Sequence, residues 1–330
     1  MAGMRTYLIP QSDVSRVLSM QQAVAAVEAA FRAYGEGKVQ MPPKSYLLFE
    51  KGDLRVMPSY EPDLGLAAVK NVNVHPGNTA LPSVMATISL FDPETGYPLA
   101  IMDGTLVTAM RTGAAGGVAA KYLARADSRV VCLVGAGRQA QTQLAALMVT
   151  VPTIERALFC DVNRERAEEL ARQSAARHGI EAAACPLDDA LAVADIVVTV
   201  TPVRKPIVMR DQVRPGTHIN AIGADAPGKQ ELDAAIIRSA RVVIDEWEQA
   251  SHGGEINVPV SQGLFGRDDL HGELGQVVCG RTPGRQSDDD ITVFDSTGLA
   301  IQDLACAALV YRAVMADGAA ARLVTLDFLS

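Results

Sequence analysis

The chain has 330 residues, 48% of them hydrophobic, which is long enough for about two domains with a full core in each. It is acidic overall, with 38 Asp and Glu residues against 30 Lys and Arg residues, and no basic run could follow a phosphate backbone. This composition argues against a nucleic-acid partner.

The cysteines and the first residues indicate a cellular compartment. The five cysteines are scattered and contain no close pair typical of a metal site; they are Cys132, Cys160, Cys185, Cys279 and Cys306. They are typical of reduced core thiols in a cytosolic protein. Residues 1–18 include an acid and arginines where a signal peptide has an unbroken apolar stretch, and no window reaches about 18 apolar residues. We therefore expect neither export nor a membrane span.

The first third of the chain predicts a helix followed by antiparallel strands. Residues 13–34 repeat apolar positions at helical spacing and are followed by Gly35 and Gly37, which predicts one amphipathic helix ended by glycine. Strand-like segments at 45–50, 53–60, 64–74 and 83–92 are separated by Gly, Pro and Asp, as antiparallel strands are. Residues 105–125 predict a helix whose Gly and Ala face permits close packing.

From Arg129 onward, strand and helix patterns alternate, which favours a doubly wound parallel sheet with helices on both faces. The predicted strands are RVVCLVGAG (129–137), RALFCD (156–161), DIVVTV (195–200), THINAIG (217–223) and RVVIDEW (241–247), with helices from about Arg138 and Arg164. Residues 298–316 are helix-like, but periodicity alone does not place them in the sheet pattern.

A glycine-rich turn lies between the first of these strands and its helix. Gly135 permits a tight turn, Gly137 lets the backbone approach a pyrophosphate, and Ala140 replaces the third glycine that allows close helix packing. The helix N-terminus then offers N–H groups to phosphates. Asp161 ends the next strand, close to the spacing of about 20 residues at which a carboxylate binds the ribose hydroxyls. The pattern predicts a dinucleotide site.

The same carboxylate predicts which dinucleotide binds. Asp161 would repel a 2′-phosphate, which favours NAD over NADP. Arg164 and Arg166 lie nearby and leave NADP as an alternative, although solvated helix charges are the simpler interpretation of both.

Two further carboxylates are candidates for chemistry. Asp225 follows the strand THINAIG and Gly223, and ligands of open parallel sheets bind at the carboxyl ends of strands. It could act as a general acid or base, or hold a substrate ammonium or a water molecule. A helix N-cap or turn role is equally supported by the pattern, and the same alternative applies to Asp295 in DSTG.

Four cations lie at unusual places in an acidic chain. Lys44 and Arg55 flank a short apolar run, where solvated strand ends are the alternative interpretation. Lys70 lies within an apolar strand and Arg111 within the small-residue face of a helix, and a charge buried there is costly without an anion. We expect a bound carboxylate as the partner of these cations.

The five histidines fall into no metal-ligand spacing. The chain contains neither a His-Glu-x-x-His pattern nor a Gly-x-Ser-x-Gly elbow. These patterns argue against a metal site and against a serine nucleophile.

Several segments together resemble the ornithine cyclodeaminase/mu-crystallin family, in the family's order and over nearly the whole chain. They are the run from VKNVNVHPGN to KYLAR (69–125), then VGAGRQAQ, GADAPGKQEL and GRQSDDDITVFDSTGLAIQD. The family includes ornithine cyclodeaminases, archaeal-type alanine dehydrogenases and ketimine reductases, which move a hydride at a carbon bearing nitrogen beside a carboxylate. The resemblance implies a Rossmann domain at 125–307, inserted in a smaller α+β substrate and dimerisation domain made of residues 1–124 and 308–330. It also implies a homodimer.

The resemblance assigns roles to individual residues. It implies that Lys44, Lys70 and Arg111 hold the substrate carboxylate, that Asp225 is the catalytic aspartate, and that Thr297 borders the substrate. We expect Lys70 to polarise the oxo or imine group as well. The expected cofactor contacts are Ser83, Arg111, Gly135, Ala136, Gly137, Arg138, Gln139, Asp161, Thr201, Gly223 and Ser296.

Arg55 departs from the ornithine branch, whose members carry a glutamate at this place for the distal ammonium of ornithine. A cation there would repel that ammonium. The resemblance therefore favours an alanine dehydrogenase-like enzyme acting on a small 2-amino acid and its 2-imino or 2-oxo acid. Alternatives are a reductase of pyrroline- or piperideine-2-carboxylate, an ornithine cyclodeaminase, and a non-catalytic nucleotide-binding protein, which the presence of both Lys70 and Asp225 opposes.

Overall fold

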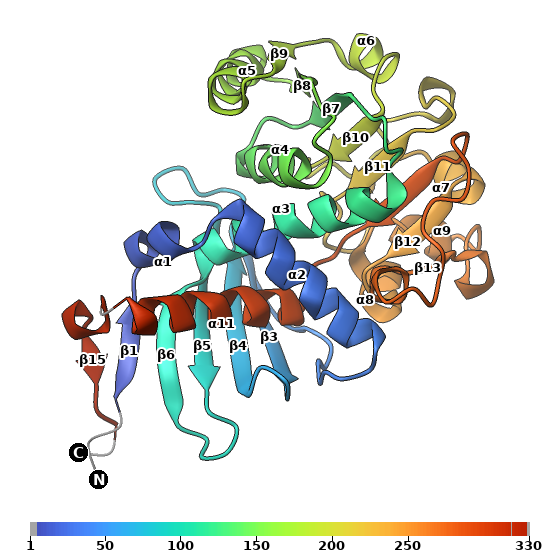
Figure 1. Ribbon diagram of the computed structural model, residues 1–330. Helices are drawn as coiled ribbons and strands as arrows, with labels where there is room; N and C mark the ends of the chain where they lie inside the picture. The colour runs from blue at the N-terminus through green and yellow to red at the C-terminus, as the bar shows by residue number, and fades with distance from the viewer. Residues whose placement is uncertain (1–4, 318, 329–330) are drawn as a thin grey trace. The chain divides into compact units, whose positions relative to one another are not determined.

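The computed structural model describes residues 5–317 and 319–328, and the chain divides into two compact units (Figure 1). Unit 1 comprises Met1–Arg111 and Leu299–Ser330, and unit 2 comprises Thr112–Gly298. The sequence predicted one domain of residues 1–124 and 308–330 and a second of residues 125–307. These limits differ from those of the two units, and the predicted domains stay a prediction. Residues 1–4, 318 and 329–330 lie outside the described part.

A seven-stranded sheet is the frame of unit 1, in the order β15-β1-β6-β5-β4-β3-β2 (Figure 1). Its strands are β1 (Thr6–Ile9), β2 (Ser45–Phe49), β3 (Gly52–Glu61), β4 (Leu66–Val74), β5 (Val84–Phe91), β6 (Pro98–Asp103) and β15 (Thr325–Leu326). The pairs from β2 to β6 are antiparallel, which confirms the strands expected between residues 45 and 92. Strands β1, β6 and β15 were not predicted. Strand β1 pairs in parallel with β6 and antiparallel with β15.

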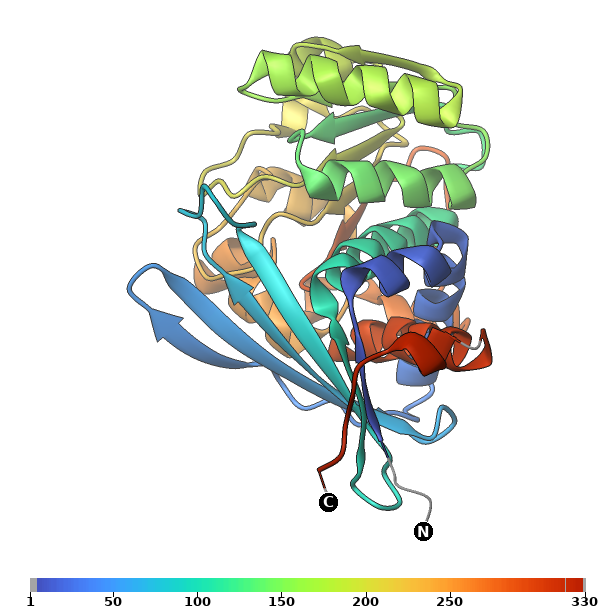
Figure 2. The same cartoon turned by 90° about the vertical axis from the view of Figure 1, so that its left-hand side faces the viewer.

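Helices α1 (Gln11–Val17), α2 (Met20–Gly35) and α11 (Ala300–Ala316) lie on one face of this sheet (Figure 2). The single helix expected over residues 13–34 is wrong, because the chain leaves the helical conformation at Leu18 and Ser19. The Ser19 side chain accepts a hydrogen bond from the Gln22 amide, while the Gln22 side chain accepts one from the Ser19 amide. This capping box starts a new helix at Met20.

Unit 2 contains an eight-stranded sheet in the order β13-β12-β14-β11-β10-β7-β8-β9, and all its strand pairs are parallel. The strands are β7 (Val130–Val134), β8 (Arg156–Cys160), β9 (Glu181–Ala184), β10 (Ile196–Thr199), β11 (His218–Ala221), β12 (Arg241–Ile244), β13 (Gly272–Glu273) and β14 (Thr292–Asp295). The doubly wound sheet is confirmed, although β9, β13 and β14 were not predicted. The order of the strands reverses between β7 and β10, the place where such sheets bind ligands.

The helices of unit 2 are α4 (Arg138–Thr150), α5 (Arg164–His178), α6 (Leu187–Leu191), α7 (Ala234–Ser239), α8 (Trp247–Gly253), α9 (Asn257–Ser261) and α10 (Leu274–Val278). Short 3₁₀ turns occur at Arg210–Gln212 and Arg267–Asp269, and in unit 1 at Ala319–Arg322. Within residues 5–317 and 319–328, no helix is both long and apolar enough to cross a membrane.

Helix α3 (Gly104–Leu123) enters unit 2 at Thr112, and its glycines pack closely against α4. A Cβ atom on Gly113 would lie 2.4 Å from the Thr142 carbonyl oxygen, and one on Gly117 would lie 2.9 Å from the Ala146 Cβ. The small-residue face predicted for this helix is therefore required by its packing.

Candidate active site

Two of the predicted cations of unit 1 lie on one face of its sheet. Met57 of β3 is paired with Lys70 of β4, and Arg55 with Val72. Along β4 the residues Ala68, Lys70 and Val72 are buried while those between them are not, and Arg55 and Met57 are buried on β3. Lys70 and Arg55 therefore point toward the covered face of the sheet, and only 1% of Lys70 is exposed.

The carboxylate of Asp303, on α11, pairs with two of the four predicted cations, Lys70 and Arg111. Lys70 Nζ lies 2.6 Å from Asp303 Oδ2, an ion pair without the angular geometry of a hydrogen bond. Arg111 Nε donates to Asp303 Oδ1 at 3.0 Å, and Arg111 Nη1 donates to Gln302 Oε1 at 2.9 Å. Asp303 is thus a resident partner of both cations, and the bound carboxylate that we expected stays a prediction. One negative charge is thus shared by two buried positive charges.

The environment of Lys70 changes its protonation. Burial lowers the pKa of Lys70 to about 7, and repulsion from Arg111 and Lys44 acts in the same direction, while attraction to Asp303 opposes it. Near neutral pH, Lys70 is therefore present both as ammonium and as amine. A side chain in this condition is suited to donate or accept a proton.

Arg55 is partnered by a nearby carboxylate. Its Nε donates to Asp53 Oδ1 at 2.8 Å and its Nη2 to Asp53 Oδ2 at 3.1 Å. The guanidinium carbon lies 5.7 Å from the centre of the Tyr46 ring. Arg55 therefore presents a cation whose charge is partly neutralised by Asp53.

The other predicted residues of unit 1 are more exposed. Lys44 is half-buried before β2 and lies close enough to Lys70 to affect its pKa. Ser83 is exposed before β5, and its carbonyl oxygen accepts a hydrogen bond from the His75 amide at 2.7 Å.

In unit 2 the glycine-rich turn has the expected geometry. Gly135 has a φ of 103°, which only glycine adopts readily. Gly137 is the N-cap of α4 and provides no side-chain hydrogen bond, and the first turn of this helix, with Arg138 and Gln139, contains no acidic residue. The N-terminal N–H groups of α4 are thus left for an anionic ligand.

Asp161 lies next to this turn, because β7 and β8 are neighbours in the sheet. Its Oδ2 accepts a hydrogen bond from the Ala136 amide at 2.7 Å, and its Oδ1 accepts one from the Asn163 amide at 2.8 Å. The Arg164 side chain is exposed and pairs with Glu168 at 2.7 Å, which fits its interpretation as a solvated helix charge.

The remaining predicted residues of unit 2 follow the carboxyl ends of neighbouring strands. Thr201 comes after β10, Gly223 and Asp225 after β11, and Ser296 and Thr297 after β14. These strands are adjacent in the sheet, in the order β14-β11-β10. The predicted residues therefore gather at one edge, which is the ligand-binding edge of such folds.

Neither Asp225 nor Asp295 caps the helix that follows it. Helix α7 begins at Ala234 and is capped by Asp233, whereas Asp225 pairs with the Lys229 ammonium. Helix α11 has Leu299 as its N-cap.

Asp295 is instead a buried carboxyl group. Its Oδ2 accepts a hydrogen bond from the Ile256 amide at 3.1 Å. Burial raises its pKa to about 8, and repulsion from Asp245 adds to this effect.

Four carboxylates that contact predicted site residues were missed in the sequence: Asp53, Glu231, Asp245 and Asp303. Asp245 accepts hydrogen bonds from the amides of Thr297 and Gly298, both at 2.6 Å, and from the Thr297 hydroxyl at 2.9 Å. The sequence could have indicated Asp245, because it directly follows strand β12 as Asp161 directly follows strand β8. It could also have indicated Asp303, because an acid within an apolar helix needs a partner, as does Lys70 within its apolar strand.

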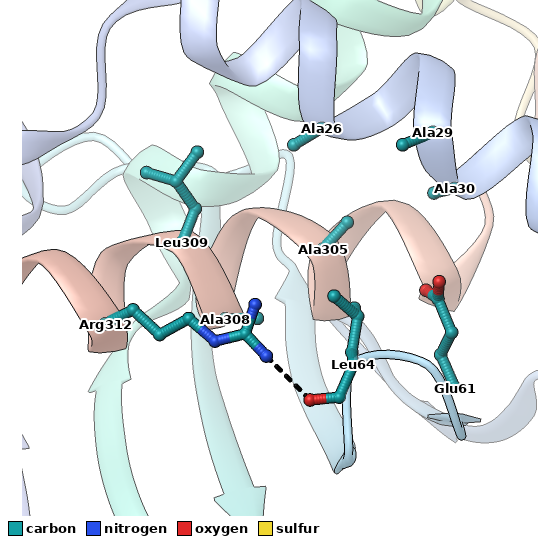
Figure 3. A pocket seen from close by; sticks show the side chains of 9 residues that line it. All are labelled: Ala26, Ala29, Ala30, Glu61, Leu64, Ala305, Ala308, Leu309 and Arg312. Carbon is teal, nitrogen blue, oxygen red and sulfur yellow. Dashed lines mark hydrogen bonds between the residues drawn. The ribbon is translucent and has the colours of Figure 1, made fainter.

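A cavity of about 300 Å³ lies elsewhere in unit 1, between α2, α11 and the turn after β3 (Figure 3). Its walls are mostly alanine and leucine side chains, with Glu61 and Arg312 at opposite sides. Arg312 Nη2 donates to the Leu64 carbonyl at 2.7 Å. No predicted substrate or cofactor residue lines this cavity.

Known proteins resemble the chain over both units. The profile of the ornithine cyclodeaminase/mu-crystallin family matches residues 4–318. The alanine dehydrogenase of Archaeoglobus fulgidus is 53% identical over 310 residues, which cover 93% of this chain and 95% of that protein. A solved archaeal alanine dehydrogenase dimer with bound NAD is 50% identical with a TM-score of 0.95, and the match covers 99% of this chain and 100% of that chain.

A second solved structure is the Thermococcus litoralis Δ1-pyrroline-2-carboxylate reductase in complex with NADH and L-proline. It is 39% identical with a TM-score of 0.92, and the match covers 95% of this chain and 98% of that chain. With the family profile matched over almost the whole length, the chain belongs to the ornithine cyclodeaminase/mu-crystallin family.

Proposed function

We propose that the protein is an NAD-dependent oxidoreductase that interconverts a small 2-amino acid with its 2-imino or 2-oxo acid, with alanine and pyruvate as the first candidates. The alanine dehydrogenase of A. fulgidus and the NAD-bound archaeal structure support this activity and this cofactor. The observation that carries the proposal is the buried cluster of Lys70, Arg111 and Asp303, in which Lys70 has a pKa of about 7.

In unit 1, this cluster suits a substrate carboxylate. Asp303 neutralises one of two buried cations, and Lys44 adds a further positive charge nearby, so a net positive charge is left for an anionic ligand. Arg111 and Lys44 would bind the substrate carboxylate. Lys70 would donate a proton to the oxo or imine group during reduction and accept it during amino acid oxidation.

In unit 2, the residues fit a dinucleotide. The uncapped N-terminus of α4 would bind the pyrophosphate, and a Cβ added to Gly137 would meet no atom within 4 Å, so the space in front of this turn is open. Asp161 would bind the ribose hydroxyls. When bound, NAD supplies or accepts the hydride. Asp225 would hold and deprotonate the water that hydrolyses the imine.

A cyclic ketimine reductase is the second candidate, favoured by the likeness to the T. litoralis enzyme. Its substrate also has a carboxylate beside a carbon–nitrogen double bond, so the same cations would serve it. Ornithine cyclodeamination is opposed by Arg55, whose charge would repel a distal ammonium.

We further propose a homodimer, supported by the archaeal alanine dehydrogenase dimer. A cytoplasmic location is supported by the five free cysteines of the structure. The net charge of -8 supports small molecules rather than nucleic acid as partners.

A direct assay tests the proposed function. The purified protein is given NADH with pyruvate and ammonium, NADH with pyrroline-2-carboxylate, or NAD with ornithine, and the absorbance of NADH is followed. We expect the first mixture to react fastest and the third not to react. If NADH binds, as measured by its fluorescence, but no mixture changes the absorbance, the protein is a nucleotide-binding protein without this activity.

A further inference from the structure

The buried carboxylate of Glu231 joins two of the loops that carry predicted site residues in unit 2. Its Oε1 accepts hydrogen bonds from the Thr201 amide at 2.7 Å and from the Thr201 hydroxyl at 2.6 Å. Its Oε2 accepts one from the Gly223 amide at 2.9 Å. Thr201 follows β10 and Gly223 follows β11, which are neighbours in the sheet. One side chain thus links the ends of two adjacent strands at the ligand-binding edge.

Glu231 is itself held firmly by the surrounding backbone. The amides of Glu231 and Leu232 donate to the Glu255 carboxylate at 2.9 and 2.7 Å. The Glu231 carbonyl oxygen accepts from the amides of Ile207 and Val208 at 2.8 and 3.1 Å. Glu231 and Glu255 are fully buried. The carboxylate of Glu231 therefore projects from a fixed point, as a residue that positions others must.

The loop that Glu231 closes also carries Asp225. The bond from Gly223 to Glu231 joins the two ends of the segment 223–231, and within this segment Asp225 pairs with Lys229. Asn257 holds the middle of the loop, because its Oδ1 accepts from the Gly228 amide and its Nδ2 donates to the Lys229 carbonyl, both at 2.8 Å. The position of Asp225 is thus set by bonds at the ends and in the middle of its loop.

The space around Gly223 shows how closely the two loops approach. A Cβ atom on Gly223 would lie 2.3 Å from the Thr201 carbonyl oxygen and 2.4 Å from Glu231 Oε2. No side chain fits there, so glycine is needed at this position for steric reasons. The hydrogen bonds of Glu231 hold the loops at this short distance.

The contacts of Glu231 require a carboxylate at this position. Both loops present N–H or O–H donors, so the side chain between them needs two acceptor oxygens, and only an ionised carboxylate has them. Glutamine would turn an NH₂ group toward the donors of one loop. Burial raises the pKa of Glu231, whereas the bonds from Thr201 and Gly223 act to lower it, so these donors favour the charged form.

We propose that Glu231 is a positioning residue, which fixes the backbone at Thr201 for the cofactor and the Asp225 loop for the proton transfer. This inference rests on the proposed function, in which Thr201 and Gly223 contact NAD and Asp225 handles the proton. Glu231 acts through these residues and does not itself touch the reacting atoms.

The experiment compares Glu231→Gln with a matched control, Asp195→Asn. Asp195 Oδ2 also accepts two backbone hydrogen bonds, from the amides of Arg129 and Val130 at 2.8 and 3.0 Å. These amides lie at the start of β7, and Asp195 directly precedes β10, at the amino ends of the strands. The control therefore changes a buried carboxylate that binds backbone amides in the same unit, at the edge opposite the predicted ligand residues. It also removes the charge that Asp195 pairs with Arg125 at 2.9 Å.

Three quantities are measured for each folded protein: the Kd for NADH by fluorescence titration, kcat with the best substrate, and Tm. In Glu231→Gln we expect kcat to fall about 100-fold, because small displacements of reacting groups have effects of this size. We expect its Kd for NADH to rise about tenfold, as when a residue that orients a ligand is lost. In Asp195→Asn, Tm falls while Kd and kcat stay at the wild-type values.

Wild-type Kd and kcat in Glu231→Gln would overturn the inference, and so would equal losses in both variants, which would indicate a general effect of stability. A wild-type protein that binds no NADH or turns over no substrate would instead contradict the proposed function. Should Glu231→Gln not fold, two other measurements decide. Glu231→Asp, too short to reach both loops, is expected to lose activity in the same way. In the unaltered protein, the amides of Thr201 and Gly223 are expected to exchange slowly with solvent before NADH is added, and fast exchange would contradict the inference.

Discussion

Lys70 and Asp303 meet in the interior of unit 1, where 2.6 Å separates the ammonium nitrogen from a carboxylate oxygen and each residue is 1% exposed. The same carboxylate binds Arg111. A charged pair as deeply buried as this one depends strongly on each partner, because the remaining charge has no access to water. The interior of unit 1 is therefore sensitive both to single substitutions and to pH.

The first prediction concerns the charge balance of this cluster. Asp303→Asn leaves Lys70 and Arg111 buried without their anion, so we expect a loss of about 3–5 kcal/mol in the free energy of unfolding. Adding Lys70→Met to this variant should restore part of that loss, since a buried polar group that has lost its partner is replaced by an apolar side chain. Urea unfolding measures both effects.

An exposed pair provides the control for Asp303. Arg129 and Glu155 are 3.0 Å apart with side chains 63% and 61% exposed. Glu155→Gln should therefore cost less than about 1 kcal/mol. If Asp303→Asn is as mild as this control, the carboxylate of Asp303 is not required to hold the cations.

The second prediction is a pH dependence of activity. Lys70 has a pKa of about 7, so its protonated form is lost as pH rises through this value. If Lys70 donates the proton in reduction, kcat/KM for the oxo acid should fall above about pH 7, as measured in a series of buffers. Lys70→Arg keeps its charge at all these pH values but cannot release a proton, so its remaining activity should be low and should lack this limb. The same limb in Lys70→Arg would show that another group titrates.

The third prediction concerns stability. Asp295 has a pKa of about 8 in the folded protein, above its ordinary value of 3.8, so between these values the folded state binds the proton more tightly than the unfolded state. Its contribution to stability is therefore present at low pH and is lost as pH rises toward 8. Asp295→Asn cannot titrate and should weaken this decline, which unfolding experiments at several pH values measure.

Asp290 serves as a control of opposite sign. Burial acts against it, but hydrogen bonds from Arg241 and from the amides of Gln286 and Ser287 lower its pKa. Its contribution is present above its ordinary pKa and is lost as pH falls, so Asp290→Asn should reduce stability at neutral pH. An unchanged pH profile in Asp295→Asn would mean that Asp295 is ionised in the fold.

The fourth prediction concerns specificity. In Arg55→Glu, a carboxylate replaces the cation beside Asp53, and the variant is best made together with Asp53→Asn to avoid repulsion between two acids. We expect kcat/KM for a small oxo acid to fall about tenfold, and oxidation of ornithine to become measurable, because a like-charge contact with its distal ammonium is removed. Asp53→Asn alone is the control. Unchanged specificity would place Arg55 outside the substrate pocket.

The fifth prediction concerns the cofactor. Asp161→Asn keeps an acceptor for the Ala136 amide but removes the negative charge that would repel a 2′-phosphate. The ratio of kcat/KM for NADH to that for NADPH should therefore fall about tenfold, while Arg164→Ala should leave it unchanged because Arg164 pairs with Glu168. A wild-type preference for NADPH would show that Asp161 does not select the cofactor.

Local patterns in the sequence predicted the glycine-rich turn well, because Gly135, Gly137 and the helix after them act within a few residues of each other. The break between α1 and α2 was also local, and Ser19 with Gln22 matches the pattern S-x-x-Q of a capping box. The break was not predicted, because the apolar residues keep their helical spacing from α1 into α2.

The partners of the buried charges could not be predicted in the same way. Arg111 and Asp303 are separated by 192 residues, and Thr201 and Glu231 by 30. Only the packing of α11 on the sheet, and of the loops after β10 and β11 on each other, brings these residues together. The apolar setting of Lys70 correctly indicated that an anion must be near, but it could not distinguish a resident carboxylate from a bound one.

The pairing of β1 with β15 bears on the order in which the two units fold during synthesis. Unit 1 uses both ends of the chain, whereas unit 2 is one continuous segment, Thr112–Gly298. Because domains fold as units during synthesis, from the N-terminus onward, unit 2 can fold on the ribosome before unit 1 is complete. Lys70 and Arg111 are synthesised long before Asp303, so both cations stay exposed to water until helix α11 has formed and packed over them.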